Sequence, residues 1–361
     1  EARSPVIICG DGVAVAGGQG ELVQLAEAIG ARVHSSFAAE LPFPSAHPLY
    51  AGLLNVVSAP ALKGQLSSAD VIFAVGTPVL PLLFPIDESP FADGAKLIHI
   101  DIDAWEIGKN WPADIGVMAD PRLAMADILA VLRSKMTGEQ RAAAKQRAAT
   151  VETMNGQLLQ ALEGAAKARW DASPMSAGRL MAELGGAMHP DTLLFDESIT
   201  SGGYVMRYLR FPDAGRHYRA IGGGLGPGMP NPIGMKLARP DRPILSVIGD
   251  GAALYTIQAL WTAAHHKIPV TWVIANNRSY RILKLNMLEY LGEGAAGRRF
   301  VEMDMTDPEL DFSQIAQAFG VKGVRVQHGD EVGDAVREAQ ASGEPRVVDA
   351  VIDGDVRSRW L

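Results

Sequence analysis

The tripeptide Gly249-Asp250-Gly251 and the pair Asn276-Asn277 are the residues in this sequence best suited to chemistry. Each follows a run of apolar residues, and Asn277 comes 27 residues after Asp250. A carboxylate and an amide oxygen are hard ligands of the kind that Mg²⁺ prefers. A helix that begins at Gly251 offers backbone N–H groups and the positive end of its dipole to an anion. This spacing predicts a site for Mg²⁺ and a diphosphate, whereas a lone Gly-Asp-Gly would favour a simple tight turn.

Short apolar runs that alternate with helical patterns must position these residues. Continuous runs rich in Val and Ile, separated by helices, are typical of a parallel sheet that is covered on both faces. Ligands bind such sheets at the carboxyl ends of the strands. We therefore predict an α/β fold with two doubly wound parallel-sheet domains, the first of them Rossmann-like. The clearest predicted strands are residues 6–9, 71–75, 97–101, 193–195, 244–248 and 270–275.

The 361 residues are too many for one ordinary core and suit two domains. We place the first, Rossmann-like domain at residues 1–134 and the second, diphosphate-binding domain at residues 173–361. Residues 135–172 are rich in Ala, Gln, Lys, Arg and Glu, which predicts a helical linker with a long solvated helix from Glu139 to Ala168. Within the second domain, Leu254, Ile257, Trp261 and Ala264 share one face of a predicted helix.

Composition excludes several classes of function. The net charge is −8 and no basic cluster occurs, so nucleic acid and anionic membranes are poor partners. No apolar run is long enough to span a membrane, and a single cysteine, Cys9, fits a cytoplasmic location. The P-loop, zincin and nucleophile-elbow motifs are all absent. The sequence lacks an initiator Met and opens directly into an apolar strand, which suggests a piece of a longer protein.

The stretch from Gly249 to Tyr280 resembles the thiamine diphosphate-dependent decarboxylases and acetolactate-synthase-like enzymes, whose diphosphate motif is GDG followed by NN. Residues 259–264, Ala-Leu-Trp-Thr-Ala-Ala, are especially similar to benzoylformate decarboxylases. Residues 41–48 and 98–103 match the central domain of the family, and residues 311–320 match its C-terminal helix. The family has pyrimidine-binding, central and diphosphate-binding domains, and this chain resembles the second and third.

The resemblance implies that Asp250 and Asn277 ligate Mg²⁺ through their side chains and Ser279 through its backbone carbonyl. It also implies that Leu225 props thiamine into a bent shape and that the carbonyl of Gly223 accepts from its amino group. The remaining cofactor-binding residues that it implies are Thr200, Ser201, Gly249, Gly251, Ala252, Tyr280 and Ile282. Many relatives have a hydroxyl where this chain has Ala252, so one phosphate contact is expected from backbone alone.

The same resemblance implies that the glutamate which activates the cofactor belongs to the pyrimidine-binding domain of a neighbouring subunit. No residue here matches it, so we assign no catalytic residue and expect the isolated chain to be inactive. We expect a homo-oligomer, a 2-keto acid substrate, and either decarboxylation or carboligation. Without the partner domain, an apolar face near Leu225 and Met229 should be uncovered. The alternative is a non-catalytic module that binds a nucleotide or a diphosphate.

Several other residues carry weaker signals. Gly10-Asp11-Gly12 suggests a dinucleotide turn, but the third glycine of that fingerprint is missing, and a structural turn is the favoured interpretation. Benzoylformate decarboxylases have a catalytic His near the position of Leu83, which casts doubt on benzoylformate as the substrate. Arg219 is expected to pair either with an acid substrate or with a surface carboxylate. Like Arg219, Asn286 lies where the aryl decarboxylases have an apolar residue. His217 is a candidate pocket residue. His265 and His266 fit the C-terminus of a helix, where their partial charge suits the dipole.

Overall fold

The computed structural model describes residues 2–36, 38–56, 58–81, 86, 88–292 and 300–356. The chain divides into two compact units. The first comprises Glu1–Leu159 with Phe211–Arg216, and the second comprises Gln160–Arg210 with His217–Leu361. Helix α5 (Gly138–Lys167) contains the residues at which the first unit gives way to the second, and it matches the predicted solvated helix within one residue at each end. The predicted domain boundaries at residues 134 and 172 stay predictions.

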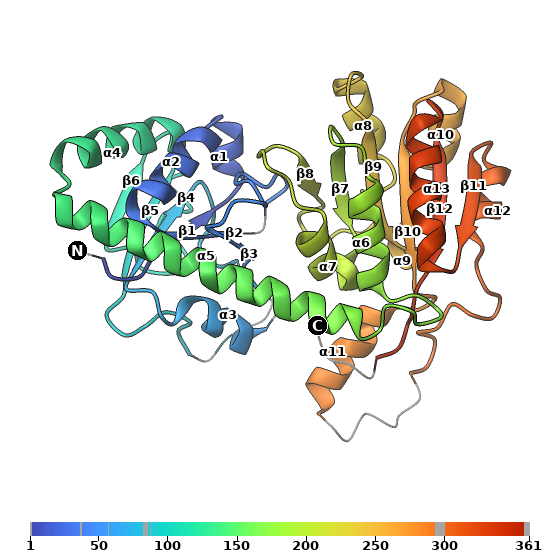
Figure 1. The fold of residues 1–361 in the computed structure, drawn as a ribbon, viewed down its shortest axis with the longest axis horizontal. Helices are drawn as coiled ribbons and strands as arrows, with labels where there is room; N and C mark the ends of the chain where they lie inside the picture. The colour runs from blue at the N-terminus through green and yellow to red at the C-terminus, as the bar shows by residue number, and fades with distance from the viewer. Residues whose placement is uncertain are drawn as a thin grey trace. The chain divides into compact units, whose positions relative to one another are not determined.

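In the described part of the first unit, six parallel strands form a sheet in the order β3-β2-β1-β4-β5-β6. Helices α2 and α4 pack against each other over this sheet, as Figure 1 shows. Helix α3 supplies buried Leu62 and Leu66 to a cluster with strand residues such as Ile8 and Ile72. The elements are β1 (Pro5–Cys9), α1 (Asp11–Val15), α2 (Gln19–Ile29), β2 (Arg32–Ser35), β3 (Tyr50–Leu53), α3 (Ala59–Leu66), β4 (Val71–Val75), β5 (Lys96–Asp101), β6 (Ile115–Met118) and α4 (Pro121–Lys135).

In the second unit, six described parallel strands form a sheet in the order β11-β12-β10-β9-β7-β8. Helices α6 and α13 run side by side along it (Figure 1). The two sheets confirm the predicted α/β fold class of two doubly wound domains. The elements are α6 (Ala177–Ala187), β7 (Leu193–Glu197), the 3-10 turn η1 (Ile199–Ser201), α7 (Gly202–Tyr208), β8 (His217–Arg219), α8 (Asn231–Ala238), β9 (Ile244–Gly249), α9 (Asp250–Ala253), α10 (Ala259–His266), β10 (Thr271–Asn276), α11 (Arg281–Leu291), α12 (Phe312–Ala318), β11 (Lys322–Val326), α13 (Gly329–Ala341) and β12 (Arg346–Val351).

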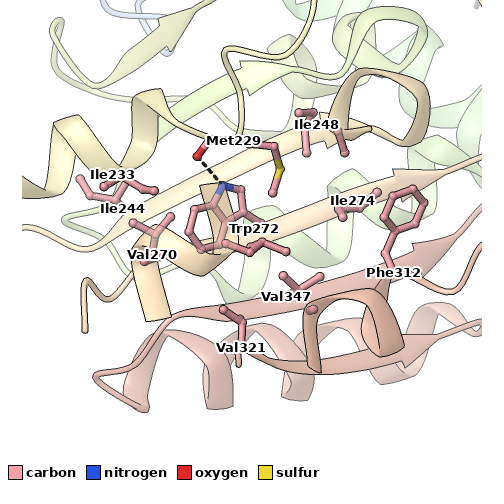
Figure 2. Packing of buried hydrophobic residues seen from close by; sticks show 14 of the residues in the cluster. Met229, Ile233, Ile244, Ile248, Val270, Trp272, Ile274, Phe312, Val321 and Val347 are labelled. Atoms are coloured by element: carbon pink, nitrogen blue, oxygen red, sulfur yellow. Dashed lines mark hydrogen bonds between the residues drawn. The ribbon is translucent and has the colours of Figure 1, made fainter. Parts of the chain in front are cut away.

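A cluster of buried side chains packs α8, α10 and α12 against the second sheet. Trp272 of β10 is fully buried in this cluster, among Ile244, Ile274 and Val347 (Figure 2). Its ring N–H donates to the carbonyl oxygen of Met229 at 3.2 Å, so the one polar atom of the indole is satisfied inside the core. The cluster therefore fixes the start of α8 relative to the ends of the central strands.

The helix predicted between the two motif strands is broken. One turn, α9, ends at Ala253, and α10 begins only at Ala259. Thr256 lies in the intervening turn, where its hydroxyl donates to the carbonyl of Gly226 at 2.6 Å. The break changes the helical phase, so Trp261 is 55% exposed and stacks on His265 instead of joining the apolar face. That part of the periodicity prediction is wrong.

The Gly10-Asp11-Gly12 tripeptide lies where β1 ends and α1 begins, and its glycines pack closely against Gly76 and Thr77 of the same unit. A Cβ atom on Gly12 would stand 2.6 Å from the Cα of Gly76. The Asp11 carboxylate accepts from the backbone N–H groups of Ala39, at 2.8 Å, and Glu40, at 3.1 Å. Close packing within the unit therefore accounts for these residue types without any ligand.

Candidate functional site

The predicted site residues of the second unit gather at the carboxyl ends of three neighbouring strands. Strand β9 pairs with β10 on one side and with β7 on the other. Asp250 follows β9, Asn277 follows β10, and the turn η1 with Ser201 follows β7. Because all three strands are parallel, their ends meet at one edge of the sheet. The structure thus brings the predicted metal ligands to the same edge of the sheet as Thr200 and Ser201.

Asp250 is a buried carboxylate whose two oxygens are held by backbone donors. Its side chain is 3% exposed. One oxygen accepts from the N–H of Gly251 at 2.7 Å and the other from the N–H of Arg278 at 2.6 Å. Burial raises the pKa of Asp250 to about 6, while these backbone hydrogen bonds act in the opposite direction. The carboxylate is therefore oriented but poorly solvated, and a cation beside it would favour its ionised form.

Asn277 presents a buried oxygen that has no hydrogen-bond partner. The residue is 8% exposed, and its Oδ1 atom is unsatisfied among the described groups. An unpaired buried amide oxygen costs free energy unless it finds a partner. Arg278, which follows Asn277, adopts a left-handed conformation with φ of 56° and carries the chain to buried Ser279. One carboxylate, one unsatisfied amide oxygen and a carbonyl from this turn are a donor set suited to Mg²⁺.

The short helix α9 places Gly251 and Ala252 directly after the carboxylate. A Cβ atom on Gly251 would stand 2.9 Å from Cε1 of Tyr280, so only glycine allows the ring this close. Ala252 is buried, with 5% of its surface exposed, and Gly249 is the last residue of β9. Tyr280 is 38% exposed at the start of α11. The backbone at Gly251 therefore follows the Asp250 carboxylate directly and packs against an aromatic side chain.

The glycine cluster before α8 forms an exposed loop that ends in a buried turn. Gly222 and Gly223 both have left-handed backbone, with φ of 81° and 76°. Leu225 is 41% exposed, whereas Met229 is fully buried in the core. The expectation of an uncovered apolar face around both residues is therefore wrong for Met229, because the core cluster encloses its side chain.

Arg219 and His217 lie on β8, which pairs with β7 on the side away from β9, and both approach the buried carboxylate of Asp196. Arg219 Nε is 3.6 Å from Asp196 Oδ2, and His217 Nε2 lies at the same distance of 3.6 Å from that oxygen. Asp196 also accepts from the hydroxyl of Ser198 at 2.5 Å. These partners hold the pKa of Asp196 below its usual value despite burial, while burial lowers the pKa of His217. Arg219 thus pairs with a buried carboxylate, so the predicted alternative of a surface ion pair is wrong.

Ile282 and Asn286 are half-buried on α11, which begins directly after Tyr280. His265 and His266 end α10, as predicted. Leu83 lies outside the described residues.

Two buried acids at this edge carry no role in the sequence-based prediction. The carboxylate of Glu197 accepts from the backbone N–H groups of Gly226 and Gly228. Asp349, fully buried in β12, accepts from Asn276 Nδ2 at 2.9 Å and from the N–H of Phe312 at 3.1 Å. Asp349 could have been found from the sequence, because it interrupts the apolar run Val347-Val348-Asp349-Ala350. An acid within a buried strand needs hydrogen-bonding partners, which marks it for attention.

Within the described ranges, no group of three or more His, Cys, Asp or Glu side chains could hold a metal ion. The candidate site has a single carboxylate and relies on amide and carbonyl oxygens, which suits a hard cation that shares its shell with phosphate and water. None of the described helices combines the length and apolar character that crossing a membrane requires.

Comparison with protein families gives two matches that together follow most of the chain. Residues 1–128 match the model described as "Thiamine pyrophosphate enzyme, central domain". Residues 200–350 match the model described as "Thiamine pyrophosphate enzyme, C-terminal TPP binding domain". The second match contains the ends of β9 and β10 and the glycine loop described above, and it begins at Thr200, just after β7.

Individual proteins with similar sequences or structures include two enzymes known from their sequences and one solved structure. The chain is 31% identical over 360 residues to a "Probable acetolactate synthase large subunit" of Methanocaldococcus jannaschii, covering 98% of this chain and 58% of that protein. It is 30% identical over 360 residues to a "Sulfoacetaldehyde acetyltransferase" of Alcaligenes xylosoxydans xylosoxydans, covering 94% of this chain and 58% of that protein. A solved "thiamine diphosphate-dependent 4-hydroxybenzoylformate decarboxylase" of Rhodococcus jostii RHA1 superposes with a TM-score of 0.80 at 26% identity, covering 98% of this chain and 62% of that one. The chain thus spans about three fifths of the length of these proteins.

Proposed function

Because the chain belongs to the thiamine pyrophosphate enzyme family, we propose that Asp250, Asn277 and Ser279 hold Mg²⁺ against the diphosphate of thiamine diphosphate. The observation that carries this proposal is the unsatisfied Oδ1 of Asn277, buried in the same strand-end site as the Asp250 carboxylate. A divalent cation bound there satisfies the amide oxygen and offsets the burial of the carboxylate together. Ser279 completes the protein ligands through its backbone carbonyl.

The remaining diphosphate contacts come from the ends of β7 and β9. Gly249 leaves room for a phosphate to approach the backbone beside Gly251, and the N–H of Ala252 faces it. Ala252 has no hydroxyl, so its contact is from backbone alone. Thr200 and Ser201, at the end of the neighbouring strand, supply hydroxyl groups.

The thiamine part lies against the glycine loop and α11. Leu225, which is 41% exposed, offers an apolar side chain for the bent cofactor to rest on. The carbonyl of Gly223 accepts from the aminopyrimidine, and Tyr280 and Ile282 line the approach. When bound, the cofactor supplies a carbon nucleophile for attack on a carbonyl substrate. The residues of this chain bind it, orient it and keep its diphosphate neutralised.

The whole protein acts on 2-keto acids, by decarboxylation or carboligation. It works as a homo-oligomer in which the pyrimidine-binding domain of a neighbouring subunit provides the activating glutamate. The described relatives, an acetolactate synthase and a decarboxylase among them, support this reaction class. The 361-residue chain on its own binds the cofactor weakly and releases no carbon dioxide from a 2-keto acid.

Calorimetry with Mg²⁺ and inorganic diphosphate on this chain tests the metal site, because that ligand needs no pyrimidine-binding domain. We expect Mg²⁺-dependent binding in the wild type and none in Asp250→Ala. The second Gly-Asp-Gly tripeptide of the chain provides a matched control, since Asp11→Ala removes the same carboxylate from the first unit. Circular dichroism shows whether both variants stay folded. Unchanged diphosphate affinity in Asp250→Ala, or equal losses in both variants, would refute the assignment.

A further inference from the structure

The carboxylate of Glu197 connects the end of β7 to the end of the glycine loop. Its Oε1 accepts from the N–H of Gly226 at 2.7 Å, and its Oε2 accepts from the N–H of Gly228 at 2.6 Å. The residue is 3% exposed, so water does not compete for either oxygen. Two hydrogen bonds to one buried, charged acceptor are stronger than neutral ones and fix the direction of both donors.

Other groups hold the same short turn from its remaining sides. The carbonyl of Gly226 accepts from Thr256 Oγ1 at 2.6 Å, and the carbonyl of Gly228 accepts from Ser246 Oγ at 2.7 Å. A Cβ atom on Gly228 would stand 2.8 Å from Glu197 Oε2, so a larger residue at this position would have to displace the carboxylate. The turn is therefore held by both its donors and its acceptors.

These hydrogen bonds fix the chain from Gly226 onward and do not extend back to Leu225. Residues 221–225 are all exposed, whereas Gly226 and Gly228 are buried. Gly226 has φ of 109°, a conformation that L side chains rarely adopt and that glycine adopts without steric cost. The first fixed backbone atom after the exposed loop is thus the N–H of Gly226, which adjoins Leu225 and points at Glu197.

We propose that Glu197 is a positioning residue: its carboxylate fixes the turn from Gly226 to Gly228 and so sets where Leu225 stands against a bound cofactor. The neighbouring acid cannot serve in its place, because side chains alternate along a strand and Asp196 faces His217 and Arg219 instead. The ligand in this inference rests on the proposed function, whereas the hydrogen-bonded turn is a property of the chain alone.

Hydrogen exchange on the 361-residue chain, without cofactor, tests the turn directly. In the wild type we expect the amides of Gly226 and Gly228 to be protected and those of Gly222 to Gly224 to exchange freely. In Glu197→Gln one donor must face an NH₂ group, so exchange at Gly226 and Gly228 should rise about tenfold relative to amides of β10. Equal exchange in the wild type across all five glycines would overturn the proposal even if the variant does not fold.

Asp349→Asn is the matched control, since it also replaces a buried carboxylate that accepts from a backbone N–H, that of Phe312. We expect faster exchange at Phe312 in this variant and unchanged exchange at Gly226 and Gly228. If Asp349→Asn accelerates the two glycines as much as Glu197→Gln does, the effect is general destabilisation and the assignment of Glu197 is wrong.

Two ligands then separate positioning from general damage to the site. Glu197→Gln should weaken thiamine diphosphate binding in the presence of Mg²⁺ by about tenfold, because Leu225 loses its fixed place. Binding of inorganic diphosphate with Mg²⁺, which uses the site at Asp250, should change less than about twofold. Equal losses for both ligands would show that Glu197 does not act through Leu225. A wild type that binds neither would overturn the proposed function, and the exchange experiment would still decide the turn.

Discussion

The substitution Asp349→Asn should change how the stability of the metal-free chain depends on pH. Asp349 is fully buried, and burial raises its pKa from 3.8 to about 6. Asn276 and Arg325 pull that pKa down, and the nearby Asp311 raises it further. Asparagine has nearly the same shape and no charge, so the variant keeps the packing of β12 and removes the ionisation. One of the two donors to Asp349, Asn276 Nδ2 or the N–H of Phe312, then faces an NH₂ group, which changes the free energy of unfolding by the same amount at every pH.

The magnitude follows from the two pKa values. The folded chain holds the Asp349 proton more tightly than the unfolded chain, whose pKa is near 3.8. The stability that this proton provides is complete below about pH 4 and is lost as the pH rises through about 6. The pKa of Asp349 differs by about two units between the folded and the unfolded chain, which corresponds to about 3 kcal/mol. The free energy of unfolding of the wild type should therefore fall by up to about 3 kcal/mol relative to the variant between about pH 4 and pH 7.

Urea unfolding of both proteins in chelator, at closely spaced pH values, measures this difference. Asp250 also has a pKa raised to about 6, but both proteins retain it, so its contribution cancels when the curves are subtracted. Differences that stay within about 0.5 kcal/mol across the range would show that Asp349 is not buried as an ionisable acid. A difference that grows in favour of the wild type with rising pH would reverse the sign of the argument.

Two further outcomes follow from the geometry and a third from the sequence. Gly251→Ala should weaken Mg²⁺–diphosphate binding at least about tenfold in calorimetry, because the new methyl group would displace the ring of Tyr280; wild-type affinity would contradict this. Gly12→Ala should lower the free energy of unfolding of the first unit by about 2 kcal/mol or more, since its Cβ would stand 2.6 Å from backbone at Gly76, and unchanged urea midpoints would disprove that close approach. The full-length enzyme should turn over benzoylformate more slowly than aliphatic 2-keto acids in a steady-state assay, because Leu83 cannot transfer a proton; a turnover of about 10 s⁻¹ or more on benzoylformate would refute this.

Strand positions were predictable from sequence where burial makes a run continuously apolar. The runs at 71–75 and 244–248 coincide with β4 and lie within β9, and both are nearly all buried. Strand β6 was not predictable in this way, because all four of its residues are exposed at the edge of the sheet. The prediction of one continuous helix around Trp261 was wrong for another reason. A turn interrupts that helix, and the hydrogen bond from Thr256 to the distant Gly226 that stabilises the turn cannot be read from local periodicity.

The candidate site shows the same limit. Asp250 and Asn277 could be predicted to lie together because each follows an apolar run that predicts a strand, and the ends of parallel strands share one edge of the sheet. Glu197 could not be given a role, because its two partners lie 29 and 31 residues further along the chain. Only the folded loop brings a backbone N–H to that carboxylate. Local pattern thus predicts which strand ends meet, and tertiary contacts decide which neighbouring acid faces the loop.

The chain contains the tripeptide Gly-Asp-Gly twice, each time where a strand of a parallel sheet gives way to a helix. Around Gly12 the opposite strand end brings its own backbone into the space, and the turn is a closed joint between two peptide segments. Around Gly251 the facing atoms belong to side chains, the ring of Tyr280 and the terminal methyl group of Met305. Substitutions opposite the tripeptide, at Gly76 or at Tyr280, can therefore open or close a binding site while the tripeptide itself stays the same. In an alignment, the residues that separate a working site from a structural turn are to be sought on the facing segment.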